Sequence, residues 1–147
     1  IHLASHGSKD GIFLSGLTEE EGKLTMEEVQ RLRLRRARMV VLSACDTFKG
    51  DVRIDGLVGI TRAFIAAGSP TVVASLWPVD DKSTKHMMKR LYDILFGDRA
   101  SDIDVCSALQ KVMIEMIKTK DKYSVKEWAP FLMYGLSPRK SSFHALN

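Results

Sequence analysis

The feature that most constrains this chain is a short apolar run, Met39 to Ala44, which ends directly on Cys45 and a polar stretch. Four to eight apolar and β-branched residues with polar flanks are typical of a strand buried on both faces, as in parallel sheets. In open α/β sheets, functional side chains gather beyond the carboxyl ends of the strands. Cys45 therefore stands where such a fold places a nucleophile, although free cysteine is also among the most buried residue types.

A second run of the same kind, Thr71 to Trp77, follows the first after one amphipathic segment at about 56–67. A strand, a helix and a strand with connections of this length predict a βαβ unit, whose two strands are parallel neighbours. The first five residues predict a further strand. We therefore expect an α/β fold with a mostly parallel sheet flanked by helices, and the loops after the three strands open on one edge.

The rest of the chain predicts further helices and strands around this unit. Thr25 and Glu28 form a capping box, which predicts a helix that ends at about Leu32 to Leu34. The other expected elements are a hairpin arm at 11–16, helices at about 82–96 and from 101–104 onward, and a last strand at 131–134. Cys106 falls in the apolar stripe of the helix after Asp104, so we expect it in the core.

Charge and composition exclude several classes of protein. The net charge is +4, with 22 basic and 18 acidic residues, and the arginines at 31–38 have no aromatic residues among them to stack on bases. These arginines indicate the solvated end of a helix, and we expect no nucleic-acid partner. No strand is followed by a glycine-rich phosphate loop, which argues against a nucleotide-binding domain. No apolar run is long enough for a membrane span.

The two cysteines lie far apart in unlike contexts, which does not suggest a disulfide framework and favours a reducing, cytoplasmic location. Residue 1 is already inside a predicted strand, with no initiator methionine before it. We therefore expect residues 1–147 to be one domain of a longer protein, with the first strands of that domain missing.

Two of the predicted strands lead into residues that suit thiol chemistry. His6 and Gly7 follow the first strand, and Cys45 follows the central one. A cysteine nucleophile works as the thiolate, and a nearby imidazole takes its proton or lowers its pKa. The backbone N–H groups of Gly7 and Cys45 would form the oxyanion hole. His2 is a rival base, which we rank second because it would point into the layers of the sheet.

The order of these motifs resembles the caspase-type clan of cysteine peptidases, in which the histidine precedes the cysteine by roughly 50 residues. More narrowly, the chain resembles the CHAT domain, the caspase-like domain found with tetratricopeptide repeats and related to separase. Five motifs in the same order carry the resemblance: residues 2–7 (HLASHG), 42–47 (LSACDT), 62–68 around Arg62-Ala63-Phe64, 74–81 (ASLWPVDD) and 128–135.

The resemblance implies a caspase–haemoglobinase fold that cleaves peptide bonds through a His6/Cys45 dyad, without a metal or other cofactor. It also implies a protein or peptide substrate and tetratricopeptide repeats upstream in the same chain. Separase-like relatives hold a basic side chain with an acidic residue in the loop after the Leu-Trp strand, where Asp81 stands here beside Asp80. Asp46 is a third candidate for substrate binding. The alternative function is a non-catalytic interaction scaffold of a repeat protein.

Asp80 and Asp81 also suit a purely structural role. They stand directly before a predicted helix, and carboxylates at that position stabilise the helix N-terminus. Both interpretations of these residues stay open at the level of the sequence.

Overall fold

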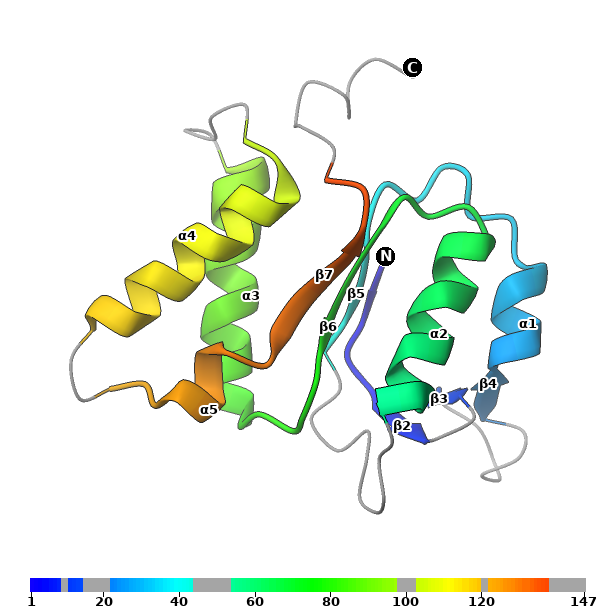
Figure 1. Cartoon of the computed structure of the whole chain (residues 1–147), viewed down its shortest axis with the longest axis horizontal. Coiled ribbons are helices and arrows are strands. Elements are labelled where there is room, and N and C mark those ends of the chain that lie inside the picture. Colours follow the sequence, from blue (N-terminus) through cyan, green and yellow to red (C-terminus); the bar gives the residue numbers. More distant parts are fainter. Residues whose placement is uncertain (9–10, 15–21, 44–53, 98–102, 120–121, 138–147) are drawn as a thin grey trace.

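A four-stranded sheet, in the order β1-β5-β6-β7, divides the molecule into two helical layers (Figure 1). The computed structural model describes residues 1–8, 11–14, 22–43, 54–97, 103–119 and 122–137. The strands are β1 (His2–Leu3), β2 (His6–Ser8), β3 (Gly11–Phe13), β4 (Lys23–Thr25), β5 (Val40–Leu42), β6 (Thr71–Ser75) and β7 (Phe131–Gly135). The helices are α1 (Met26–Arg31), α2 (Ile54–Ala66), α3 (Asp81–Phe96), α4 (Val105–Lys118) and α5 (Val125–Trp128).

The central part of the sheet is parallel, as the sequence predicts. Strands β1 and β6 both pair with β5 in parallel, with Leu3 opposite Leu42 and Val41 opposite Val73. Strand β7 joins the other edge of β6 in the antiparallel sense. The expected mostly parallel sheet flanked by helices is therefore confirmed, and the carboxyl ends of β1, β5 and β6 lie at one edge.

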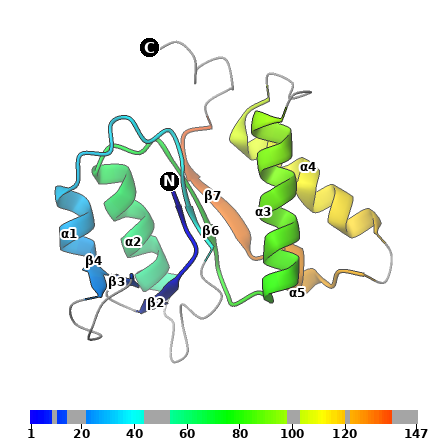
Figure 2. The same cartoon turned by 180° about the vertical axis from the view of Figure 1, so that it is seen from behind.

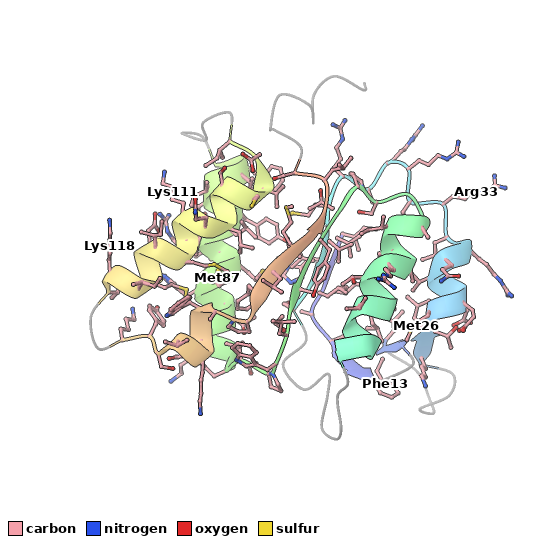
Figure 3. All side chains as sticks on the ribbon, in the orientation of Figure 1. Phe13, Met26, Arg33, Met87, Lys111 and Lys118 are labelled. Atoms are coloured by element: carbon pink, nitrogen blue, oxygen red, sulfur yellow. The ribbon has the colours of Figure 1, made fainter. Side chains whose placement is uncertain are left out.

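The two faces of the sheet carry two separate hydrophobic cores, which explains why β5 is apolar at every position and β6 at its three central ones. Helices α1 and α2 cover one face, and α3, α4 and α5 cover the other (Figures 1 and 2). Val40 and Leu42 pack on the α2 side, whereas Met39 and Val41 pack with Met87 and Leu91 of α3. The side chains that fill both layers are drawn in Figure 3.

A second, three-stranded antiparallel sheet, in the order β2-β3-β4, adjoins the carboxyl end of β1 (Figure 1). The expected hairpin arm corresponds to β3, which pairs with both neighbours. The capping box of Thr25 and Glu28 is present at the start of α1, which ends at Arg31, slightly earlier than predicted.

The prediction that Cys106 belongs to the core is wrong, because its side chain is exposed. The buried positions of α4 are Val105, Ala108, Leu109, Val112 and Met116. Cys106 is one residue, or about 100° of helical rotation, away from Val105. The apolar stripe of α4 is therefore present, with Leu109 and Met116 buried, but it does not include Cys106.

Candidate active site

The first components of the candidate site are the ends of two adjacent parallel strands. Leu3 of β1 lies opposite Leu42 of β5, and the backbone N–H of Ser43 donates to the carbonyl of Leu3 over 3.1 Å. After Ala4 and Ser5 the chain enters β2 at His6, whose backbone pairs with Phe13. The predicted residues Cys45 and Asp46 lie outside the described residues, and so does the side chain of His6.

The backbone of Gly7 takes its orientation from the small sheet. Because the N–H of Leu14 donates to the carbonyl of Gly22, the backbone groups of Ile12 and Leu14 point toward β4. The backbone N–H and C=O groups of Gly11 and Phe13 then point toward β2. There they form hydrogen-bonded pairs with Ser8 and His6. By this alternation, the N–H of Gly7 is directed away from β3.

The two predicted specificity carboxylates have different environments. Asp80 is the N-cap of α3, and its Oδ1 accepts hydrogen bonds of 3.0 Å from the backbone N–H groups of both Lys82 and Ser83. Contacts with Ser83, and then the backbone N–H of Lys82, hold the pKa of Asp80 below its usual range. The carboxylate of Asp81 is exposed in the first turn, and no hydrogen bond or ion pair joins it to any residue that the structure describes.

The loop that leads to these carboxylates is fixed to α5. The indole N–H of Trp77 donates to the carbonyl of Lys126 over 2.9 Å. The hydroxyl of Ser83 donates to Glu127 over 2.7 Å, and the other carboxylate oxygen of Glu127 accepts from the N–H of Ser124. The segment from the end of β6 to the start of α3 is therefore held from both ends.

A hydrogen-bonded group of three side chains lies on the α3 side of β1 and β5, and sequence reasoning did not find it. Nε2 of His2 is 2.5 Å from Oγ of Ser43, and Nδ1 of His2 is 3.0 Å from the hydroxyl of Tyr92. Burial, followed by the charge of the N-terminal amino group, lowers the pKa of His2. Burial also raises the pKa of Tyr92, so its hydroxyl stays protonated at neutral pH. In the sequence, His2 stands out only as a rival base, and its partners Ser43 and Tyr92 depend on strand register and helix packing.

Comparison with known proteins identifies the family. Residues 1–136 match the sequence profile of a protein family described as "CHAT domain". The chain belongs to the CHAT domain family. Tetratricopeptide repeat protein 28 of Mus musculus is 32% identical over 119 residues, and the human protein of the same name is 32% identical over 124 residues. The matched regions cover 81% and 84% of this chain but 5% of each relative.

Across the described ranges, no group of three or more His, Cys, Asp or Glu side chains is gathered as a metal ion would require. None of the helices in the same ranges combines the length and the apolar character needed to cross a bilayer.

Proposed function

We propose that this CHAT domain is a cysteine endopeptidase in which Cys45 is the nucleophile and His6 the general base. His6 takes the proton of the Cys45 thiol, and the thiolate attacks the carbonyl carbon of the scissile peptide bond. The resulting oxyanion accepts hydrogen bonds from the N–H groups of Gly7 and Cys45. Collapse of the intermediate breaks the C–N bond, His6 protonates the leaving amine, and water then hydrolyses the thioester.

The observation that carries this proposal is the register of β1 and β5. His6 follows Leu3 by three residues, and Cys45 follows Leu42 by three residues, while Leu3 and Leu42 lie directly opposite each other. Three residues span at most about 10 Å, and neighbouring strands lie about 4.8 Å apart. The register supports the proposal because the two segments that carry His6 and Cys45 start from matched positions at the same edge of the sheet.

The hydrogen bonds of His2 support His6 as the base. Both ring nitrogens of His2 are engaged, one with Ser43 and the other with Tyr92. A general base needs a ring nitrogen that is free to accept the proton of the thiol. His2 would have to give up one of these two contacts, whereas the orientation of the Gly7 N–H fits an oxyanion hole that follows His6 directly.

For the substrate, we assign the recognition of a basic side chain to Asp81. The Oδ1 atom of Asp80 already accepts two backbone hydrogen bonds at the start of α3, whereas Asp81 is exposed beside it. A carboxylate in this position can hold an arginine or lysine through charge-assisted hydrogen bonds. The mouse and human relatives are named as tetratricopeptide repeat proteins. We therefore propose that repeats in the same protein present a protein substrate to this domain in the cytoplasm.

The test uses the full-length protein in a Cys106→Ser background, because the exposed thiol of Cys106 would otherwise react with the same reagents. The wild-type dyad should cleave arginine-containing peptides and be labelled covalently by a peptidyl-arginine acyloxymethyl ketone. Cys45→Ala should abolish both signals, and His6→Ala should reduce both by orders of magnitude.

The second candidate function is a non-catalytic interaction scaffold, which the repeat-protein names of the relatives favour. Cleavage that persists in the Cys45→Ala variant would refute the dyad. If the wild-type protein showed neither cleavage nor labelling, but the folded domain still bound protein partners, the scaffold would replace the peptidase.

A further inference from the structure

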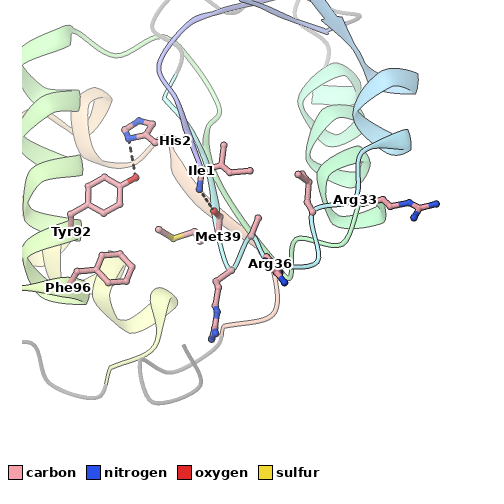
Figure 4. A pocket seen from close by; sticks show the side chains of 10 residues that line it. Ile1, His2, Arg33, Arg36, Met39, Tyr92 and Phe96 are labelled. Atoms are coloured by element: carbon pink, nitrogen blue, oxygen red, sulfur yellow. Dashed lines mark hydrogen bonds between the residues drawn. The ribbon is translucent and has the colours of Figure 1, made fainter. Parts of the chain in front are cut away.

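The polar group formed by His2, Ser43 and Tyr92 joins three elements of the fold. His2 lies in β1, Ser43 directly follows β5, and Tyr92 lies in α3. Figure 4 shows the Tyr92 side chain reaching from α3 to the His2 ring. The two rings also pack at a centroid distance of 5.7 Å, and Tyr92 stacks on Phe96 of the next helical turn. We call this group the His2 clamp.

The burial of Ser43 shows why the clamp matters to the strands. Ser43 is 6% exposed, and a buried hydroxyl without a hydrogen bond is costly. Its partner is Nε2 of His2, which lies on the neighbouring strand rather than on its own. Since Val41 is opposite His2 in the parallel register, His2 reaches one pleat forward along β5 to meet Ser43. The side-chain bond therefore depends on the register and separation of the two strands.

The chemistry of the three side chains allows a continuous chain of hydrogen bonds. Neutral imidazole has one donor and one acceptor nitrogen, and the hydroxyls of Ser43 and Tyr92 can each serve as either. The pKa of His2 is lowered and that of Tyr92 is raised, so both groups stay uncharged around neutral pH. Either tautomer of His2 then satisfies both hydroxyls.

The clamp joins β1 to the end of β5, close to the point where the two strands lead toward the proposed dyad. Ser43 precedes Cys45 by two residues, and His2 precedes His6 by four. We propose that His2, Ser43 and Tyr92 are positioning residues of the peptidase, which fix β1 against β5 and thereby set His6 against Cys45. This inference rests on the proposed function, because it assigns the clamp to that same dyad.

The cleft beside the clamp makes mild substitutions practical. A cleft of about 660 Å³ is lined by His2, Tyr92, Phe96 and Met39, among other residues (Figure 4). Tyr92→Phe keeps the ring that packs on His2 and leaves room for water at the lost hydroxyl. Ser43→Ala removes one buried hydroxyl without adding bulk. Ser43→Thr keeps the hydroxyl and serves as the rescue variant.

The experiment measures alkylation of Cys45 by iodoacetamide between about pH 5 and pH 9, together with kcat and KM on an arginine peptide, in the full-length Cys106→Ser protein. Tyr92→Phe and Ser43→Ala should each lower the alkylation rate near neutral pH and kcat by about three- to tenfold, with KM unchanged. Ser43→Thr should restore most of the rate.

Two matched variants serve as controls. Tyr134→Phe removes a tyrosine hydroxyl on the α2 face of the sheet, and Ser69→Ala removes a buried serine hydroxyl, which donates to the carbonyl of Thr71. Both should keep the parent alkylation profile, even where thermal stability falls.

The outcomes separate the clamp from the dyad. If His6→Ala slows alkylation but folded Ser43→Ala and Tyr92→Phe proteins retain the parent pH profile and kcat, the clamp is structural only and the inference is wrong, while the dyad stands. If His6→Ala also leaves alkylation and cleavage unchanged, the dyad is wrong and the positioning role falls with it.

Discussion

Substitutions can distinguish the roles of Asp80 and Asp81 at the start of α3, because the two carboxylates make different contacts. The Asp80 side chain caps the helix by accepting two hydrogen bonds of 3.0 Å from backbone N–H groups, and the Asp81 carboxylate accepts none from the described residues. Asp80→Ala should therefore destabilise the domain by about 1 to 2 kcal/mol, the usual cost of removing an N-cap acceptor. In a chain of this size, that corresponds to a fall in Tm of about 2 to 4 °C for each kcal/mol.

The matched variants follow from the same contacts. Asp80→Asn keeps a side-chain oxygen that can accept both hydrogen bonds, so its stability should stay within about 0.5 kcal/mol of the parent. Asp81→Asn removes a charge near the helix N-terminus and should cost about 0.3 to 1 kcal/mol. Its main effect should instead be on the substrate, because loss of a charge-assisted contact should weaken the preference for arginine over leucine by about 10- to 100-fold.

The assay combines urea unfolding at pH 7 with kcat/KM for a pair of peptides that differ only in arginine or leucine before the scissile bond. Asp80→Ala should shift the unfolding midpoint and leave the ratio of the two kcat/KM values nearly unchanged. The division of roles is refuted if Asp81→Asn destabilises the domain as much as Asp80→Ala does, or if Asp80→Asn loses the arginine preference while Asp81→Asn retains it.

Two further predictions concern the framework. Gly135 has φ +91° and a Cβ there would lie 2.3 Å from the carbonyl oxygen of Pro70, whereas Gly68 has φ +108° but a nearest contact of 3.3 Å. In thermal unfolding, Gly68→Ala should lower the stability by about 1 to 3 kcal/mol through backbone strain, and Gly135→Ala should lower it clearly more. Equal losses of stability would contradict the predicted clash with Pro70. Hydrogen bonds, first from the Ser137 hydroxyl, hold the pKa of Asp104 well below its usual 3.8. The ionised Asp104 therefore stabilises the fold fully above pH 3.8, and this stabilisation is lost as the pH falls below 3.8. Asp104→Asn should therefore flatten the fall in stability between about pH 5 and pH 2 in urea titrations, and an unchanged slope would refute this cause.

The sequence predicts those parts of the fold that depend on local periodicity. The run Val40–Leu42 is apolar at every position because both of its faces are covered, and this pattern distinguishes it from a half-exposed strand. The spacing of Ile60 and Phe64 predicts the buried side of α2, and Thr25 with Glu28 predicts the start of α1. Short-range rules suffice here, since each signal and its structural effect lie within one helix or strand.

The features that the sequence did not reveal depend on how separate elements meet. Tyr92 falls among the apolar residues of α3, and nothing local in the sequence indicates that its hydroxyl meets a histidine 90 residues earlier in the chain. The bond between His2 and Ser43 requires the register of two strands, which apolar runs alone do not specify. At α3, by contrast, the sequence offered both roles for Asp80, and the observed cap shows that the structural one is present.

Helix α3 brings these separate findings into one mechanical unit. Asp81 is in its first turn, and Tyr92 lies eleven residues later, about three turns along the same helix. Met87 and Leu91, between them, are fully buried against the sheet, so the helix has little freedom to bend or slide. The Asp80 cap and the Ser83–Glu127 bond fix one end of the helix, and the His2 clamp fixes its Tyr92 turn to β1. In the proposed enzyme, the carboxylate that binds the substrate and the strand that leads to the general base are thus held by the same rigid element. A basic substrate side chain bound at Asp81 is then positioned relative to His6 through helix α3, without contacting His6 itself.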